Sequence, residues 1–549
     1  MRDRSILSEP SPEGESKDTD YAIVGSGFGG SVSALRLAEK GYSVLVLEQG
    51  KRWKAEDFPK TNWNLRRFIW MPRLLLHGFQ QITLLRDVLV FHGAGVGGGS
   101  LVYANTLLVP PDAFFEDPKW ADMARWKEVL APHYATAKRM LGVTEAAFLA
   151  ETDEHLRAVA RDMGREETFH RTHVGVYFGE PGKTVPDPFF GGEGPERTGC
   201  TLCGGCMVGC RHGAKNTLDK NYLYLAEKKG ARVQPETRVS DIRPLEGGGY
   251  ELSLERSTSL VFKGRTKLRA KNVIVAAGVL GTVKLLMACR DRGSLTLPAP
   301  LGSYVRTNSE ALLGIKSKRT DVDYSKGIAI SAGFHADDKT HIETVRYPKG
   351  SDFMSLLGTV LVGGGRVPRP LHFLGAILRH PIQFLRLLWP FGWAKRTVIL
   401  LCMQPLDNSL ELRMRRPWYW PFRRSLDSDR GDRPPAPTYI PVANETAVRM
   451  AKRMDGMPQS VLPEVLLDTC STAHILGGCA IGHGPADGVV DGSCRVFGHE
   501  GLYVIDGSVI PANLGVNPSL TITAIAEHAM SQIPPKPQSS TPIATSRAS

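Results

Sequence analysis

The stretch that decides the fold is Asp20-Tyr21-Ala22-Ile23-Val24-Gly25-Ser26-Gly27-Phe28-Gly29-Gly30, an apolar run that leads into a glycine-rich turn. A helical pattern follows at 31–40, and a second apolar run at 43–47 ends on Glu48. Gly25, Gly27 and Gly30 form G-x-G-x-x-G, which between a strand and a helix is typical of dinucleotide binding. The first glycine permits the turn, the second lets a pyrophosphate approach, and the third lets helix and strand pack closely.

Glu48 adds a second feature of a dinucleotide site. It stands about 20 residues after the turn, where a carboxylate can accept hydrogen bonds from the ribose hydroxyls. A carboxylate would repel a 2′-phosphate, so FAD or NAD fits better than NADP. The pyrophosphate would lie at the helix N-terminus, where free N–H groups favour anions. The motif leaves FAD and NAD open, and a glycine turn in another α/β unit is the alternative.

Length, composition and charge narrow the class of protein. The 549 residues allow two or three domains, and 42% hydrophobic residues are ordinary for a globular α/β protein. The net charge of +12 would suit nucleic acid or an anionic membrane surface. No basic helix with interleaved aromatic residues is suited to reading bases, so we expect no nucleic acid and favour peripheral membrane contact.

The two ends of the chain are polar. Residues 1–19 have mixed charge and lack the apolar core of a signal peptide, so we expect a cytoplasmic protein with a disordered N-terminus. Residues 534–549 are rich in Pro, Ser and Thr and are expected to form a disordered tail. No run is long and uncharged enough to span a bilayer.

Four of the nine cysteines lie close together, at Cys200, Cys203, Cys206 and Cys210. Their C-x2-C-x2-C-x3-C spacing matches bacterial ferredoxins, although Arg211 stands where proline usually follows. Thiolates on a glycine-rich loop can converge on an iron–sulfur cluster or zinc. We expect an iron–sulfur cluster before zinc, and a reduced cysteine-rich turn is the alternative.

The rest of the chain extends the α/β pattern and adds a second region. A glycine run at 93–99 would let backbone pass against a flat or charged ligand, and a flexible loop is the alternative. Further elements are expected as helices at 118–165, 221–229 and 519–531, a helix starting near Gly281, and strands at 232–239, 272–277 and 502–505. Between about 300 and 465 the pattern favours antiparallel strands, such as 327–331 and 340–347.

One segment of this second region is unusually apolar. Residues 370–393 are rich in aromatic residues, carry arginines, and are interrupted by Pro381 and Pro390. The pattern is typical of an amphipathic element in a membrane interface, and a buried helical hairpin or a lid over an apolar pocket is the alternative. Residues 66–76 mix apolar and basic side chains in the same way.

Four motifs in order resemble the glucose–methanol–choline (GMC) family of FAD oxidoreductases, across about 20–533. They are Gly25–Gly30, Gly95–Ser100, His474-Ile475-Leu476-Gly477-Gly478, and Asp506-Gly507-Ser508 with Gly515-Val516-Asn517-Pro518. Residues 95–103, 200–218 and 514–520 are similar to the family's bacterial branch that oxidises cholesterol, in particular the mycobacterial type.

The resemblance implies where FAD would bind. The turn glycines would contact the pyrophosphate, Glu48 the ribose, and the backbone of Val239 the adenine. Gly95, Gly99 and Asn105 would lie along the isoalloxazine, with Asp506 and Gly507 near the phosphates and ribityl chain. The implied FAD-binding residues are Gly25, Gly27, Phe28, Gly29, Gly30, Glu48, Gly95, Gly99, Asn105, Val239, Asp506, Gly507 and Asn517. No residue marks a covalent flavin link; His92 lies near the right segment, but its position does not favour one.

The resemblance also implies catalytic residues. His474 matches the family's catalytic histidine, and imidazole titrates near neutrality, which suits a general base. Asn517 matches the second active-site residue, whose amide can donate to the substrate oxygen or the flavin edge. Glu343 is similar to the glutamate that moves a proton from C4 to C6 in sterol isomerisation, with Glu310 as a substitute. A core histidine, a turn asparagine and a surface glutamate are the structural alternatives.

These observations predict a Rossmann-like FAD-binding domain (20–52, 88–110, 211–300 and 471–533). The predicted substrate domain (53–87, 111–210 and 301–470) has an antiparallel sheet with helices on one face. The implied reaction is oxidation of a 3β-hydroxysteroid such as cholesterol, with O2 as acceptor and H2O2 as product, accompanied by 5-ene to 4-ene isomerisation if Glu343 acts. Two alternatives stay open: a dehydrogenase of another lipid or terpenoid alcohol that passes electrons through an iron–sulfur cluster to a carrier, and a membrane-associated flavin/metal redox sensor without turnover.

Overall fold

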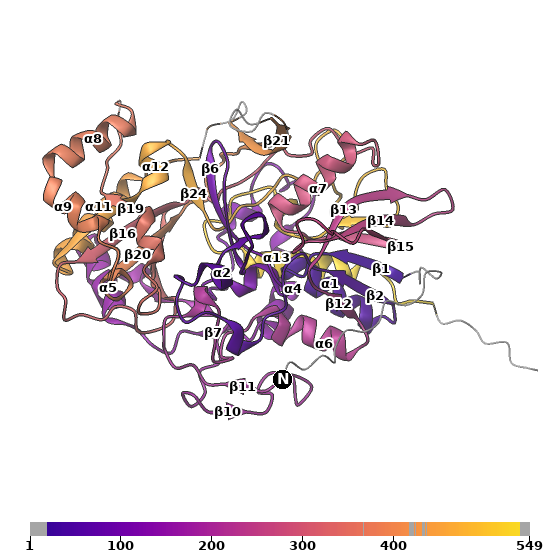
Figure 1. The fold of residues 1–549 in the computed structure, drawn as a ribbon, viewed down its shortest axis with the longest axis horizontal. Coiled ribbons are helices and arrows are strands. Elements are labelled where there is room, and N and C mark those ends of the chain that lie inside the picture. The colour runs from indigo at the N-terminus through magenta and orange to yellow at the C-terminus, as the bar shows by residue number, and fades with distance from the viewer. Residues whose placement is uncertain are drawn as a thin grey trace, which may run out of the picture.

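The computed structural model describes residues 19–365, 367–416, 422, 424–430, 434 and 436–537. Two lobes are each built on a seven-stranded sheet (Figure 1). Of the two ends expected to be disordered, 1–18 and 538–549 lie outside the described residues. The expected boundaries are wrong by a few residues, because Thr19 begins a strand and the Lys536 ammonium donates to the Asp20 carboxylate at 2.5 Å.

The first lobe contains the predicted Rossmann-like sheet. Its order is β12 (Arg232–Gln234), β2 (Val44–Leu47), β1 (Thr19–Val24), β15 (Thr266–Val275), β14 (Tyr250–Arg256) and β13 (Thr237–Pro244), with β25 (Leu502–Val504) also paired to β15. β12, β2, β1, β15 and β25 run parallel, and every residue of β1 and β2 is buried. Burial on both faces explains why these strands are continuous apolar runs.

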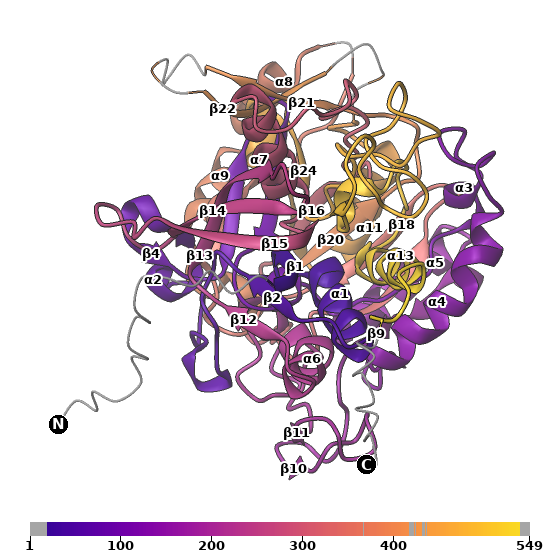
Figure 2. The same cartoon turned by 90° about the vertical axis from the view of Figure 1, so that its right-hand side faces the viewer.

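Helices cover this sheet. α1 (Phe28–Glu39) packs against α6 (Tyr222–Lys228) and α13 (Ser519–Ser531), and α13 also packs against α4 (Trp126–Met140), as Figure 2 shows. α7 (Val279–Asp291) contacts β13. The bounds of α13 match the prediction, whereas α1 begins three residues earlier than expected, since the glycines of the turn already form its first turn.

Two expected strands of this lobe have different bounds. The strand predicted at 232–239 is two strands, because Pro235 lacks an N–H and Glu236 has φ +53°, which turns the chain between β12 and β13. The strand predicted at 272–277 begins earlier, at Thr266. Its first half alternates charged and apolar residues and pairs antiparallel with β14, so it lacks the apolar run that marks a parallel strand.

The second lobe contains the predicted antiparallel sheet. Its order is β19 (Gly358–Val360), β23 (Gly456–Val461), β16 (Ala311–Ser317), β20 (Thr397–Met403), β18 (His341–Val345), β17 (Ile330–His335) and β8 (His170–Arg171). α11 (Pro441–Arg453) and α5 (Glu151–Asp162) pack on one face, and their buried side chains share a core with Leu313, Phe334 and Leu400. β17 starts three residues later than the strand predicted at 327–331, and β18 is shorter than 340–347.

A three-stranded sheet lies between the lobes: β24 (Cys470–Thr472), β6 (Val88–Gly93) and β5 (Gln80–Leu84) (Figure 1). The shorter elements are α2 (Leu65–Phe68), β3 (Trp70–Met71), β4 (Leu76–His77), α3 (Asp112–Phe115), β7 (Thr144–Glu145), β9 (His173–Val174), β10 (Thr184–Val185), β11 (Arg197–Thr198), α10 (Trp393–Arg396), β21 (Glu411–Arg415), β22 (Ser425–Asp429) and α12 (Leu462–Leu466).

The apolar segment 370–393 forms a pair of helices, α8 (Arg369–Arg379) and α9 (Pro381–Leu388), at the outer edge of the second lobe (Figure 1). Phe373 and Leu387 face inward onto Val360 and Met457. The outward face is also apolar, with more than half of each side chain exposed in Leu371, Leu374, Leu378, Ile382, Leu385, Leu388, Trp389 and Phe391. The alternative of a buried hairpin is therefore wrong. Within the described ranges, no helix has both the length and the apolar character needed to cross a membrane.

Candidate active site

The glycine turn after β1 is pressed against the ends of two other strands. A Cβ on Gly25, whose φ is +101°, would lie 2.2 Å from the carbonyl oxygen of Ala276, and one on Gly29 would lie 1.7 Å from that of Ile505. Gly27 differs, since a Cβ there meets nothing within 4 Å. Gly27 is the N-cap of α1, so open space lies in front of that helix's free N–H groups. An anionic pyrophosphate fits this arrangement.

The second glycine run packs directly on the first. A Cβ on Gly98 would lie 2.6 Å from Cα of Gly27, and the amide of Gly97 donates to Oγ of Ser26 at 3.1 Å. Gly95 and Gly99 therefore lie beside the turn, as expected for residues along one ligand. Asn105 follows with φ +64°, and both polar atoms of its buried side chain lack a partner. Buried amides without partners are rare in folded proteins, so Asn105 fits a ligand contact.

Glu48 and Asp506 are buried carboxyls that hold neighbouring loops. Glu48 accepts hydrogen bonds from the amide and hydroxyl of Ser26 (3.1 and 2.7 Å) and from the amide of Gly50 (2.8 Å). Asp506 accepts from the amides of Gly278 (2.9 Å) and Ser508 (2.8 Å). Burial raises the pKa of both carboxyls. Both acids thus hold the loops beside the glycine turn, and their contact with the ligand stays a prediction.

The other predicted FAD-binding residues lie in or beside the same lobe. Val239 is buried in β13, and Gly507 is buried directly after Asp506. The ring of Phe28 meets that of Tyr103 edge-on, with centroids 5.7 Å apart. Two independent features would contact FAD: the open N-terminus of α1 and the unpartnered side chain of Asn105. The residues present therefore fit this cofactor.

His474 is paired with a buried acid. Its Nδ1 hydrogen-bonds Oε1 of Glu310, and the other carboxylate oxygen of Glu310 accepts from the amide of Ala473 at 2.8 Å. The His474 amide donates to Oγ1 of Thr472 at 2.9 Å. The Glu310 side chain is fully buried, whereas 14% of the His474 side chain is exposed. The pair therefore holds the imidazole in one orientation and leaves Nε2 for another partner.

Asn517 and Glu343 form the second half of the site. The amide Nδ2 of Asn517 donates to Oε2 of Glu343 at 3.2 Å, while Oδ1 of Asn517 and Oε1 of Glu343 are buried without partners. Glu343 interacts electrostatically with both His474 and Glu310. The structure thus brings together the three predicted catalytic residues, which are far apart in the sequence. The surface-glutamate alternative for Glu343 is wrong, because its side chain is fully buried.

The electrostatics of the four groups suit proton transfer near neutral pH. Burial raises the pKa of Glu343 to about 7, although Asn517 and His474 oppose the shift. Burial by itself would lower the pKa of His474, but the charge and hydrogen bond of Glu310, together with the charge of Glu343, raise it above its ordinary value. A histidine held by a carboxylate and a buried carboxyl whose pKa is raised toward neutrality are groups that general acid–base catalysis can use.

Two positioning residues escaped the sequence analysis. Asn308 accepts hydrogen bonds from the amides of Leu514 (3.1 Å) and Gly515 (2.8 Å) and donates to the carbonyl of Val516 (3.0 Å), so it holds the loop that ends at Asn517. Glu310 was considered only as a substitute for Glu343. Residues 306–310 lie beside the His474 segment through paired backbone bonds of Arg306 and Leu476, a long-range contact that no local motif signals.

The four cysteines of the predicted metal site are not grouped as metal ligands in the described residues. Cys200, Cys206 and Cys210 accept hydrogen bonds from the amides of Leu202, Ala329 and Lys215 at 3.4–3.5 Å, and Cys203 is exposed. Burial raises the pKa of Cys200 to about 12 and that of Cys206 to about 11, which favours neutral thiols. The part of the chain that the structure describes contains no group of three or more His, Cys, Asp or Glu side chains placed to hold a metal. The iron–sulfur or zinc site therefore stays a prediction that the described residues do not support.

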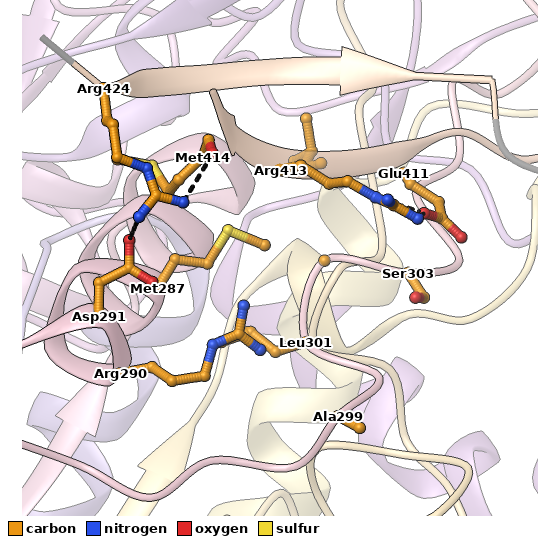
Figure 3. Close-up of a pocket in the computed structure, with 12 residues that line it drawn as sticks. Met287, Arg290, Asp291, Ala299, Leu301, Ser303, Glu411, Arg413, Met414 and Arg424 are labelled. Atoms are coloured by element: carbon orange, nitrogen blue, oxygen red, sulfur yellow. Dashed lines mark hydrogen bonds and ion pairs between the residues drawn. The ribbon is translucent and has the colours of Figure 1, made fainter. Parts of the chain in front are cut away.

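Two further features lie outside this site. His92 is half-buried in β6 and hydrogen-bonds Oγ1 of Thr83 at 2.9 Å, and desolvation lowers its pKa to about 4. A cavity of about 370 Å³ opens between α7 and strand β21, where Arg424 is paired with Asp291 (Figure 3). None of the predicted site residues lines this cavity.

A dinucleotide cradle on a Rossmann-like sheet, together with a histidine that is paired with a buried carboxylate, fits a flavin-dependent oxidoreductase, and the relatives of this chain show that the cofactor is FAD. Family models described as GMC oxidoreductase match residues 195–289 and 424–526, and a model of the NAD(P)-binding Rossmann-like domain matches 23–67. The chain belongs to the GMC oxidoreductase family, which confirms the resemblance and the predicted fold.

Relatives and solved structures agree with this family. The chain is 50% identical to a cholesterol oxidase of Acinetobacter baumannii, over 94% of this chain and 95% of that protein. It is 47% identical to a cholesterol oxidase of Mycobacterium tuberculosis, over 94% and 92%. The fold is similar to solved structures of pyridoxine 4-oxidase from Mesorbium loti (TM-score 0.61, 15% identity, 94% of this chain and 99% of that one) and of formate oxidase (TM-score 0.60, 14% identity, 94% and 97%).

Proposed function

We propose that this enzyme oxidises a 3β-hydroxysteroid such as cholesterol to the ketone, with O2 as acceptor and H2O2 as product. The observation that carries the proposal is the grouping of His474, Asn517 and Glu343 at one place, in a chain that is half identical to a cholesterol oxidase. Substrate and acceptor come from the named activity of these relatives.

The wall around Glu343 suits an apolar substrate. Glu343 pairs across the sheet with Leu401, and Leu401 packs with Ile330, Val345 and Met403 in an apolar cluster. Ala104, the neighbour of Asn105, contacts the same cluster. Apolar side chains thus extend from the proposed flavin contact to the buried carboxyl, as binding of a sterol ring system would require.

The proposed oxidation uses His474 as the base. Neutral Nε2 of His474 would accept the proton of the substrate hydroxyl while Glu310 stabilises the imidazolium that forms. The Asn517 amide would donate to the substrate oxygen. Bound FAD, held by the N-terminus of α1 and by Asn105, would supply the acceptor for the hydride from the carbinol carbon.

The buried Glu343 supports a second proton-transfer step. A carboxyl with a pKa of about 7 exists in both protonation states near neutral pH, so it can take a proton from C4 of the 5-ene-3-one and return it at C6. No charge is left behind, because the carboxylate is regenerated. We therefore include 5-ene to 4-ene isomerisation in the proposed function.

Peroxide formation tests the substrate class. We expect the purified holoenzyme to produce H2O2 with cholesterol and much less with its 3α-epimer or with a long-chain primary alcohol, because the base must face the hydroxyl of a bound ring. Equal rates with the epimer and the primary alcohol would contradict a 3β-hydroxysteroid site while leaving alcohol oxidation intact.

We further propose that the helix pair α8–α9 contacts an anionic membrane surface, where sterols reside. Its apolar side chains point outward, and Arg379 and Arg386 lie exposed among them. Phe391, just after α9, stacks on Trp63, just before the apolar and basic residues 66–76, with ring centroids 6.4 Å apart. An apolar face with basic residues is typical of peripheral binding.

Vesicle sedimentation tests this contact. The double variant Leu378→Glu, Ile382→Glu should lose binding to vesicles of phosphatidylcholine and phosphatidylserine. Phe262→Glu changes an apolar residue that is even more exposed (87%) and lies between β14 and β15, so this variant should keep binding. If both variants bind like the unmodified protein, α8–α9 does not mediate the contact.

A further inference from the structure

The cysteine-rich turn (200–210) is hydrogen-bonded to the segment that leads into β17. The amide of Gly204 donates to the carbonyl of Gly327 at 2.7 Å. The amide of Ala329 donates to Sγ of Cys206 at 3.4 Å. These two bonds hold the turn beside the antiparallel sheet of the second lobe.

A buried lysine holds the other side of the turn. Lys215 is 1% exposed, so its ammonium needs partners inside the protein. The ammonium donates to the carbonyls of Cys206, Leu101 and Tyr103 at 2.7, 2.9 and 3.3 Å. Leu101 and Tyr103 precede Asn105, the proposed flavin contact. The turn is therefore fixed to the flavin loop as well as to the sheet.

The sheet presents one apolar face on which Glu343 lies. Side chains alternate along a strand, so Glu343 and Val345 share a face of β18. Leu401 and Ile399 of β20 are their cross-strand partners and lie on the same face. The helices α5 and α11 pack on the opposite face, around Leu400. The Glu343 face is therefore the one that is turned away from these helices.

Met207 is the residue of the turn that reaches the Glu343 face. Its side chain packs against the buried cluster of Ile330, Val345, Leu401 and Met403. Four apolar residues around this cluster are each partly exposed: Ala104, Met207, Leu312 and Ile399. The turn thus adds a side chain to an apolar surface that the protein's own packing leaves partly uncovered.

Met207 lies at the flavin end of this surface. Met207 follows Cys206, and Ala104 follows Tyr103, in the chain. The carbonyls of Cys206 and Tyr103 accept from the same ammonium, and Met207 and Ala104 contact the same cluster. The ring that carries the reacting hydroxyl has to reach the flavin, whereas the tail of a sterol extends away from it. Met207 is therefore placed beside the hydroxyl-bearing end of the proposed substrate.

We propose that Met207 determines which steroid ring shapes the active site accepts. The inference rests on the proposed oxidation of a 3β-hydroxysteroid. The face of β18 and β20 provides a flat apolar floor, and Met207 stands at its flavin end as a wall. A flat ring system can lie along this floor. A cis junction between the first two rings turns the hydroxyl-bearing ring out of the plane, so that this ring needs the space that Met207 fills.

A matched pair of saturated sterols tests this role. 5α-Cholestan-3β-ol is flat and 5β-cholestan-3β-ol is bent, and neither has a double bond to isomerise, so peroxide release measures oxidation alone. We expect the unmodified holoenzyme to have the higher kcat/KM with the flat sterol. Met207→Ala should raise the bent-to-flat ratio of kcat/KM roughly tenfold, because apolar side-chain atoms are removed from the wall. Met207→Leu nearly conserves the volume and should keep the ratio.

A second methionine provides the control. Met163 is also partly exposed, but it packs on the opposite face of the sheet. Met163→Ala should leave the ratio unchanged, whereas a general loosening of the lobe would change it in both alanine variants. Rates are compared per bound flavin, so that loss of cofactor is not mistaken for a change in substrate choice.

The outcomes separate this inference from the proposed function. An unchanged ratio in Met207→Ala, an equal change in Met163→Ala, or equal kcat/KM for both saturated sterols in the unmodified enzyme would overturn the role of Met207 alone. If the unmodified enzyme oxidises neither these sterols nor cholesterol, the proposed function fails and the role of Met207 fails with it.

Discussion

His474 and Glu310, 164 residues apart in the chain, are joined through Nδ1 and Oε1 in the interior of the protein. The second oxygen of Glu310 is held by the amide of Ala473, so the carboxylate is fixed relative to the histidine from two directions. This relationship turns an isolated histidine in a glycine-rich segment into an oriented base whose pKa is raised.

Replacing either partner should slow flavin reduction. His474→Gln should reduce its rate by roughly 10²–10⁴-fold, because the substrate hydroxyl loses its base. Glu310→Gln should cause a smaller loss. Stopped-flow absorbance under anaerobic conditions measures both rates. Glu445→Gln, which removes an exposed carboxylate of α11, is the control and should react like the unmodified enzyme.

The pH dependence of flavin reduction should show whether the charge of Glu310 acts on the pKa of His474. The rate of reduction should increase as the pH rises through the raised pKa of His474, because only the neutral ring accepts a proton. Glu310→Gln removes the negative charge that raises this pKa, so its profile should move to lower pH. A profile that stays in place, with only the rate reduced, would mean that Glu310 does not act through the histidine.

Glu343→Gln should abolish isomerisation while leaving oxidation largely intact. It should also change stability in a pH-dependent way. The folded-state pKa of Glu343, about 7, lies above the ordinary 4.5, so the folded protein binds this proton more tightly and stability falls as the pH rises from about 4.5 to 7. Thermal unfolding should show the variant more stable than the unmodified enzyme at pH 8, by up to roughly 3 kcal/mol, and similar to it at pH 4.5. A constant difference at both pH values would argue against a buried titrating carboxyl.

Alanine substitutions at two glycines of the first turn should have different effects, one on stability and one on FAD binding. Gly29→Ala forces a Cβ to within 1.7 Å of the Ile505 carbonyl and should destabilise the apoprotein. Gly27→Ala adds a Cβ in open space at an ordinary φ of −71°. It should fold normally and bind FAD more weakly, because the methyl group enters the space proposed for the pyrophosphate. Denaturation of the apoprotein measures the first effect, and flavin titration measures the second. If Gly27→Ala binds FAD as tightly as the unmodified protein, the pyrophosphate does not lie next to Gly27.

Asn308 should matter for both stability and catalysis. Asn308→Gly keeps the positive φ of 57° accessible but leaves two buried amides and a carbonyl unpaired, at a cost of roughly 1–3 kcal/mol. The loop before Asn517 should loosen, so kcat should fall more than FAD affinity. Asn444→Gly, which removes one hydrogen bond to the carbonyl of Val362, is a control for stability without a catalytic effect.

Local patterns predicted much of the fold. The glycine turn, the apolar parallel strands and α13 are encoded by neighbouring residues, and the structure has them with small changes at their ends. The split between β12 and β13 and the charged half of β15 were missed, since they depend on one turn conformation and on antiparallel pairing.

The candidate site was only partly accessible to sequence reasoning. The resemblance supplied His474, Asn517 and Glu343, and the structure groups them. Glu310 and Asn308 act through contacts that are distant in the chain, so no spacing rule could assign them. The cysteine cluster is a different case: ferredoxin-like spacing suggested a metal, and the structure shows three partly buried thiols packed against apolar side chains, so the metal stays a prediction.

Anaerobic mixing of the yellow holoenzyme with cholesterol tests the central claim most directly. Our account predicts that the flavin absorbance bleaches with cholesterol alone, and that it recovers with release of peroxide when air enters. Bleaching without rapid recovery in air would contradict O2 as the acceptor. No bleaching with cholesterol would contradict the assignment of a 3β-hydroxysteroid as the substrate.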